Sequence, residues 1–130
     1  MTSQPEAMPS KDEIVNLDTL KDNWNAYMGA YGAQAEDERA RLLEQSVSDD
    51  VVFTNPAGDG KSRAGLSDHI GRFQMGNPGA YFSTDKLYPQ PDKLLAVWSM
   101  YKADGTKVAT GYNFVRPGAD GRFSYMAGFF

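Results

Sequence analysis

Apolar side chains in the first half of the chain recur at the spacing of helices. From residue 17 onward they return every three or four residues, which places on one stripe Leu17, Leu20, Trp24, Tyr27, Met28 and Tyr31. Two glycines predict that this helix ends near Gly32. A second helix is predicted over about residues 36–47, because acidic residues fill its first turn, where the helix dipole favours them. Ser62 predicts the N-cap of a third helix, whose apolar face carries Leu66, His69, Ile70 and Phe73.

The second half of the chain shows the alternation of β-strands. A short β-prone run, Val51–Phe53, comes before the third helix, and four longer runs follow Ala80. These four predicted strands span about residues 81–88, 94–101, 107–116 and 122–130. Asp104-Gly105 is typical of a two-residue hairpin turn, which places Asn113 opposite Ala96. Helices followed by a meander predict an α+β fold, with three N-terminal helices packed on a strongly curved, mostly antiparallel sheet.

Length and composition limit the class of protein. We expect one domain over residues 14–130, preceded by a polar N-terminal tail over residues 1–13. With no cysteine and one histidine, disulfides, thiolate or multi-histidine metal sites and cysteine nucleophiles are excluded, and we expect no metal and no cofactor. The net charge of −4 and the scattered basic residues argue against a nucleic-acid partner. Because no apolar run approaches the ~20 residues of a membrane span, we expect a soluble cytoplasmic protein that binds no membrane.

Short motifs make the chain resemble a known superfamily. Residues 48–56, SDDVVFTNP, are similar to the Asp-rich entry to the first strand in ketosteroid isomerases and SnoaL-like polyketide cyclases. YNFVR at 112–116 and DGRF at 120–123 are similar to the last hairpin of those proteins. The order and spacing of these motifs extend the likeness over about residues 16–130. The resemblance implies the nuclear-transport-factor-2-like fold, a cone-shaped barrel with one apolar pocket.

The resemblance also implies candidate catalytic residues. Asn55 stands where the isomerases have their general-base Asp, and an amide cannot carry a proton near neutral pH; before Pro56 it is also a common turn residue. Asn113 stands where they have the protonated Asp of an oxyanion hole, and an amide can donate the same hydrogen bond. The tyrosine of that hole corresponds to Tyr31, or to Tyr27 one turn earlier. The alternative for both tyrosines is a place in the core with the hydroxyl at its rim.

Two polar residues on apolar faces are open to two interpretations each. His69 is either a core histidine bonded to backbone or, at a position that the resemblance places in the pocket wall, a general acid/base, since imidazole titrates near neutrality. Asn113 either makes a structural hydrogen bond to a helix or donates into the pocket, because an unpaired buried amide is costly.

Aromatic and small residues on the same faces predict the wall of the pocket. We expect the ligand to contact Trp24, Phe53, Phe73, Trp98, Met100, Gly111, Met126, Gly128 and Phe130. Opposite Trp98, Gly111 would leave room for a ring or a ligand. Core packing without ligand contact is equally consistent with the residues of the last strand.

Taken together, these residues predict a small cofactor-independent isomerase, cyclase or lyase that acts on a hydrophobic cyclic carbonyl, polyketide-like or terpenoid-like compound. Asn113 with Tyr27 or Tyr31 would polarise a substrate oxygen, and His69 would move the proton. The alternative is a non-catalytic domain for small-molecule binding or assembly, which the amide at position 55 favours. A homodimer through the outer sheet face is also predicted, because apolar surface needs cover and this face carries Tyr101, Val97, Val108, Tyr112 and Phe114.

Overall fold

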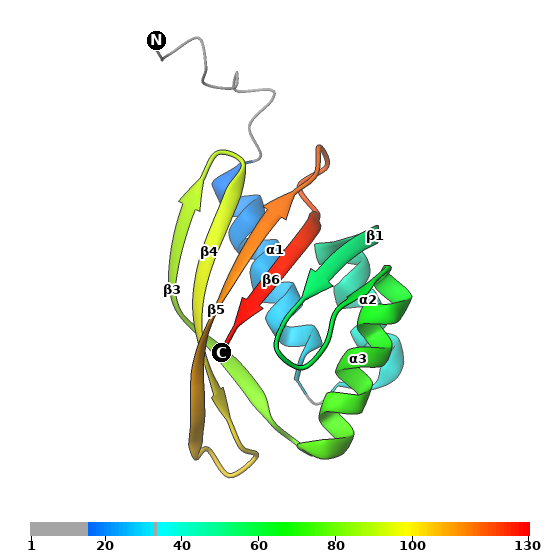
Figure 1. Ribbon diagram of the computed structural model, residues 1–130, viewed down its shortest axis with the longest axis vertical. Coiled ribbons are helices and arrows are strands. Elements are labelled where there is room, and N and C mark those ends of the chain that lie inside the picture. Colours follow the sequence, from blue (N-terminus) through cyan, green and yellow to red (C-terminus); the bar gives the residue numbers. More distant parts are fainter. Residues whose placement is uncertain (1–15, 33) are drawn as a thin grey trace, which may run out of the picture.

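The computed structural model describes residues 16–32 and 34–130 of the chain (Figure 1). The tail predicted for residues 1–13 lies outside the described residues. In the described part, the helices are α1 (Leu17–Ala30), α2 (Glu36–Ser46) and α3 (Arg63–Gly76). The strands there are β1 (Val47–Thr54), β2 (Gly60–Lys61), β3 (Tyr81–Gln90), β4 (Lys93–Tyr101), β5 (Lys107–Pro117) and β6 (Phe123–Phe129).

The strands form one mixed sheet in the order β2-β1-β6-β5-β4-β3. β1 and β6 run parallel, whereas the other neighbours are antiparallel. Figure 1 shows α1 running behind β4, β5 and β6, with α2 and α3 beside β1. The predicted α+β fold, with helices packed on a mostly antiparallel sheet, is confirmed. Within the described residues the sheet stays open, with β2 and β3 at its edges, so it is a curved sheet rather than a closed barrel.

Side-chain caps fix where the helices begin. The Asn16 carboxamide accepts a hydrogen bond from the Asp18 N–H at 2.7 Å, which satisfies a free donor at the start of α1. Ser62 caps α3 as predicted, since its hydroxyl oxygen accepts from the Gly65 N–H at 3.0 Å. At the other end of α1, Tyr31 is the C-cap residue, close to the predicted break at Gly32. Tyr31 therefore lies at the C-terminal end of α1.

The β4–β5 hairpin differs from the predicted two-residue turn. The Lys102 N–H donates to the Thr106 carbonyl at 2.8 Å, which leaves three residues, 103–105, in the loop. The turn favoured by Asp-Gly needs a positive φ at both central residues. Gly105 has a φ of 89°, but Asp104 does not adopt a positive φ. The chain therefore inserts one residue more than the sequence pattern indicates.

The register of β4 on β5 nevertheless agrees with the prediction. The pairing shifts between Met100 and Tyr101, and this irregularity compensates for the longer loop. Asn113 consequently pairs with Ala96, as predicted. On its other side, Asn113 pairs with Gly128 of β6. One amide side chain thus stands in the middle of the inner sheet face.

The core lies between this inner face and the helices. Its largest fully buried side chains come from α1, α2, α3 and the strands, and they include Trp24, Phe123, Leu20, Leu43, Leu66, Ile70, Leu94 and Met126. β1 extends beyond the predicted run Val51–Phe53 because it pairs with β6 as far back as Val47. A cluster of aromatic rings, which includes Tyr31, Phe82 and Trp98, packs against this core.

Candidate functional site

A cavity of about 140 Å³ lies between the inner face of the sheet and helices α1 and α3. The helices and the loop after β1 contribute to its wall Tyr27, Met28, Tyr31, Asn55, Ala57, His69 and Phe73. The sheet contributes Phe82, Trp98, Met100, Ala109, Asn113, Gly128 and Phe130. Most of these side chains are aromatic or aliphatic, and a few polar groups converge among them, a composition typical of small-molecule sites.

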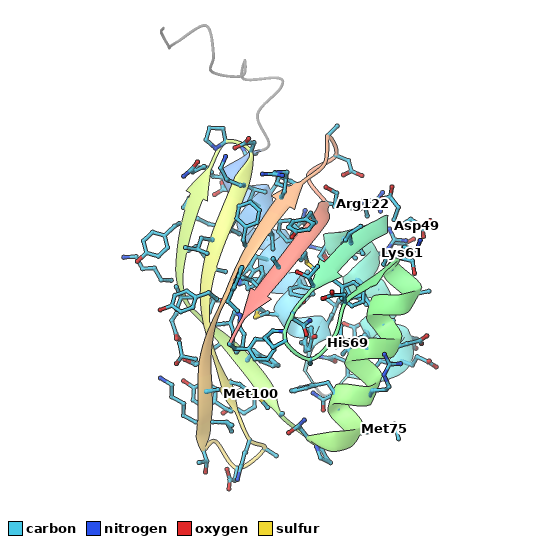
Figure 2. The ribbon with its side chains drawn as sticks, in the orientation of Figure 1. Asp49, Lys61, His69, Met75, Met100 and Arg122 are labelled. Atoms are coloured by element: carbon cyan, nitrogen blue, oxygen red, sulfur yellow. The ribbon has the colours of Figure 1, made fainter. Side chains whose placement is uncertain are left out.

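All the residues that the sequence marked for catalysis line this cavity: Tyr27, Tyr31, Asn55, His69 and Asn113. They come from α1, the loop after β1, α3 and β5, so only the folded chain brings them together. Figure 2 shows His69 on the side of α3 that faces the sheet, whereas Met75, farther along the helix, points away. The exposed fraction of Met75, 83%, agrees with that view.

The residues predicted to contact a ligand divide into two groups. The cavity wall includes Phe73, Trp98, Met100, Gly128 and Phe130. Outside it, Trp24 is fully buried in the core, where its indole N–H donates to the Thr84 hydroxyl at 2.8 Å. Met126 is also buried in the core, 1% exposed. The Phe53 ring covers Gly60 and borders a neighbouring depression instead.

Trp98 fixes the orientation of the Asn113 amide. The Trp98 Nε1–H donates to Asn113 Oδ1 at 2.9 Å, and both side chains are buried, 6% and 8% exposed. Because an indole N–H can only donate, the amide oxygen must be the atom that faces it. The amide NH₂ group is the donor that remains, and among the described residues it has no hydrogen-bond acceptor, on a side chain that lines the cavity. A buried donor without an acceptor is costly, so this group is suited to a ligand oxygen.

Gly111 makes room for Trp98 itself rather than for a ligand. It pairs with Trp98 across β4 and β5, and the indole ring lies over it. A Cβ atom at position 111 would stand 2.3 Å from the ring carbon Cζ2 of Trp98, well inside van der Waals contact. The absence of a side chain at Gly111 therefore allows the indole to reach Asn113.

The two tyrosines are buried donors. Burial raises the pKa of Tyr27 well above its ordinary value, and the neighbouring Tyr31 raises it further. Burial also raises the pKa of Tyr31, although its hydrogen bond with Tyr27 acts in the opposite direction. Their rings meet edge to face, with centroids 5.5 Å apart. Both hydroxyls stay protonated at physiological pH, so they can donate to an oxygen but cannot serve as bases.

Gln74 of α3 holds the end of α1 in place. Its amide Nε2 donates to the carbonyl oxygen of Tyr31 at 2.8 Å and to that of Ala80 at 2.9 Å. Its Oε1 accepts from the Gly79 N–H at 3.2 Å. One side chain thus ties Tyr31 to the loop that leads into β3, which orders the cavity wall at that corner.

His69 is the one wall residue that titrates near neutrality. Burial lowers the pKa of its imidazole below the ordinary value of 6.5, and the positive charge of Arg72 lowers it further. At pH 7 the ring is therefore neutral, with one nitrogen able to accept a proton. It packs against Phe53 and Tyr31, with ring centroids 5.6 and 6.4 Å apart. No hydrogen bond from the imidazole to backbone is found among the described residues.

Asn55 combines a turn with a place in the wall. Its Oδ1 accepts from the Ala57 N–H at 2.9 Å, the geometry of an Asx turn. The same side chain lines the cavity, at the position where the resemblance placed a carboxylate base. Since an amide does not titrate, Asn55 can offer a ligand hydrogen bonds but cannot take up its proton.

Four wall residues were not among those predicted to contact a ligand: Met28, Ala57, Phe82 and Ala109. The alternation along residues 81–88 could have indicated Phe82, which faces the inside with Thr84. Ala109 shares the inner face with Asn113 by the same period of two. Ala57 lies in a loop, where no periodic pattern applies.

The described residues contain neither a metal-binding cluster nor a membrane-spanning helix. No group of three His, Cys, Asp or Glu side chains lies close enough there to hold a metal ion. Within residues 16–32 and 34–130, none of the helices combines the length and the apolar character that crossing a bilayer requires.

Comparison with known families agrees with this architecture. The sequence model of the family described as SnoaL-like domain matches residues 18–126, which is most of the chain. The chain belongs to the SnoaL-like family. Among curated proteins, no sequence matches this SnoaL-like chain.

Solved structures resemble this SnoaL-like protein in fold. A protein from Agrobacterium tumefaciens, proposed to be an isomerase of the SnoaL-like family, is 20% identical with a TM-score of 0.80, over 87% of this chain and 97% of that one. A proposed polyketide cyclase from Sinorhizobium meliloti is 15% identical with a TM-score of 0.66, over 82% and 93% of the two chains. TerC, co-crystallised with polyporic acid, is 17% identical with a TM-score of 0.64, over 84% and 91%. At these identities the likeness shows the fold, which is called NTF2-like or cystatin-like.

Proposed function

We propose that this SnoaL-like protein is a cofactor-independent enzyme that performs acid/base chemistry on a hydrophobic cyclic carbonyl compound, as an isomerase, cyclase or lyase. The observation that carries the proposal is the Asn113 amide in the cavity wall, whose oxygen is held by Trp98 at 2.9 Å and whose NH₂ has no acceptor among the described residues. A buried donor prepared in advance stabilises charge that develops on a substrate oxygen. The small molecules suggested for relatives, a polyketide and polyporic acid, agree with a cyclic, oxygen-bearing ligand.

In the proposed reaction, neutral His69 accepts a proton from the carbon next to the carbonyl. The negative charge moves to the carbonyl oxygen, where the Asn113 NH₂ and a tyrosine hydroxyl, that of Tyr31 or Tyr27, donate hydrogen bonds. The protonated imidazole then returns the proton to another carbon or to a leaving group. His69 takes the place of the carboxylate base, since the amide of Asn55 cannot do so.

The reaction should depend on pH through His69. Only neutral imidazole can accept the proton, so the rate should rise with pH and level off above the pKa of His69. Burial and Arg72 lower that pKa, so the midpoint should lie below 6.5. The raised pKa values of Tyr27 and Tyr31 mean that neither should cause a fall in rate below pH 10. The measurement is the exchange of the α-hydrogens of cyclohex-2-enone for deuterium, followed by NMR; an enzyme-dependent rate that is flat between about pH 5 and 8 would contradict the role of His69.

The second candidate function is a binding domain without chemistry, and the amide at Asn55 favours it. Such a protein would bind cyclic carbonyl compounds in the same cavity but would not speed the exchange of their α-hydrogens. Its affinity for a neutral ligand should also not change as His69 titrates. If cyclic carbonyl compounds bind but their α-hydrogens are not exchanged faster at any pH, the protein is a binding domain and not an enzyme.

A homodimer through the outer sheet face is part of the proposal. Val108 and Tyr112 are each 49% exposed on that face, on the opposite side of β5 from Asn113. Sedimentation at micromolar concentration should give twice the chain mass of 14.3 kDa. Tyr112→Asp should shift the protein toward monomer because it buries a charge in the contact. The matched control, Met75→Asp on α3, should leave the mass unchanged, and a parent that sediments as a monomer would refute the dimer.

A further inference from the structure

The volume of the cavity limits how much of a ligand it can hold. At about 140 Å³ it is close to the engineered apolar cavity of about 150 Å³ that is known to hold benzene. A single six-membered ring therefore fills it. Fused ring systems of two to four rings are larger than this cavity and would have to extend beyond its walls.

The walls that set this volume are rings packed on one another. The Phe82 ring lies 5.3 Å from that of Trp98 and 5.3 Å from that of Tyr31, and 5.5 Å from that of Phe73. Trp98 is in turn held by Asn113 and lies against Gly111. Because these contacts restrain one another, the cavity cannot widen without breaking several at once.

A second, larger depression adjoins the cavity. It has a volume of about 490 Å³ and shares three wall residues with the cavity, Ala57, His69 and Phe73. Its own charged residues are exposed on the loop after β1, on β2 and on α3, and they are Asp59, Lys61, Asp68 and Arg72. Within the described residues, none of these four takes part in an ion pair.

Two positively charged and two negatively charged side chains line the depression. The one nearest to the cavity mouth determines which ligand group is attracted there. His69 lines both spaces, and the positive charge of Arg72 adds to burial in lowering its pKa. Arg72 follows His69 by three residues on α3, which makes the two side chains neighbours on one helix face, and both line the depression. A negative group that leaves the cavity past His69 comes within reach of the guanidinium of Arg72.

We propose that the ligand is a single-ring compound whose ring oxygen binds the Asn113 amide inside the cavity and whose carboxylate arm passes His69 to reach Arg72. This inference rests on the proposed function in taking Asn113 as the anchor of the oxygen. It assigns the inner cavity to one ring and the depression to an acidic side arm. The ligand is thus smaller and more polar than a steroid or a fused polyketide.

Phenols test the size limit, because a phenol is a flat analogue of the enol of cyclohexenone. Binding of phenol, 2-naphthol and the four-ring phenol equilenin can be followed by titration calorimetry and by tryptophan fluorescence, since Trp98 lines the cavity. Phenol should bind at least tenfold more tightly than equilenin. Met100→Ala enlarges the cavity and should raise the affinity for 2-naphthol, whereas Met75→Ala, at an exposed site, should not. Tighter binding of equilenin than of phenol to the parent protein would overturn the proposal.

Arm recognition is tested with 3-(4-hydroxyphenyl)propanoate and its neutral amide. The acid should bind more tightly than the amide, and Arg72→Gln should remove most of that preference while leaving phenol binding unchanged. Asp68→Asn, a change of the opposite charge on the same helix, should preserve or increase the preference. If the amide binds as well as the acid, or Asp68→Asn removes the preference as Arg72→Gln does, the carboxylate arm is refuted.

The two proposals fail in different ways. If single-ring phenols bind as expected but α-hydrogen exchange is absent, the enzyme hypothesis fails and the ligand class stands. If exchange occurs on large fused ketones and not on cyclohex-2-enone, the enzyme hypothesis stands and the ligand class fails.

Discussion

Replacing His69 by alanine is expected to slow the α-hydrogen exchange of cyclohex-2-enone by ~10²–10⁴-fold, the usual contribution of a positioned general base. The reason is that the other polar wall residues cannot accept a proton at neutral pH. Asn55 and Asn113 are amides, and the raised pKa values of Tyr27 and Tyr31 keep both hydroxyls protonated. NMR exchange rates at saturating ketone give the measurement.

Two controls separate proton transfer from packing. His69→Gln keeps a polar side chain of similar reach but cannot carry a proton, so it should be as slow as the alanine variant. Imidazole added to the buffer should restore part of the exchange in His69→Ala, because the vacated space can admit the missing base. Full activity in His69→Gln would show that the ring only fills space, and the proposed base would have to be abandoned.

Much of the fold follows from local patterns because each pattern has a local physical cause. The stripe from Leu17 to Tyr31, the cap at Ser62 and the alternating strands after Ala80 each satisfy requirements within a few residues of chain. The pairing of Asn113 with Ala96 was also predicted correctly, although the predicted hairpin loop was one residue too short. An irregularity in the pairing after Met100 compensates for the longer loop, and no local sequence pattern predicts this irregularity.

The wall of the site was harder to predict, because whether a side chain faces a core or a cavity depends on three-dimensional packing. Trp24 lies on the same helical stripe as Tyr27, yet it ends in the core, bonded to Thr84. The same limit applies to Gly111, whose open space is filled by Trp98. A sequence pattern indicates which face of an element turns inward, but not whether its inner neighbours leave a space. The hydrogen bond that orients Asn113 is likewise visible only once two strands are paired.

Replacing Asn113 by leucine is expected to slow the same exchange by ~10²–10³-fold, as the loss of one oxyanion donor does in other enzymes. Leucine has the same branched shape but cannot donate to the developing oxygen charge. It also leaves the Trp98 N–H without its acceptor, which should lower the free energy of unfolding by about 1–3 kcal/mol. Exchange rates and urea unfolding together measure the two effects.

A double variant separates the catalytic loss from the loss of stability. In Trp98→Phe with Asn113→Leu, both partners of the hydrogen bond are replaced by apolar groups, so most of the stability should return while the exchange stays slow. Trp98→Phe alone keeps the amide but frees its oxygen to turn toward the cavity, so it should lose part of the rate and none of the amide donors. If a fixed amide donor speeds the exchange, the exchange rates should fall in a graded order. The parent should be fastest, Trp98→Phe intermediate and both leucine variants slowest. Equal rates in the parent and the double variant would mean that the buried amide serves only the packing of β4 on β5.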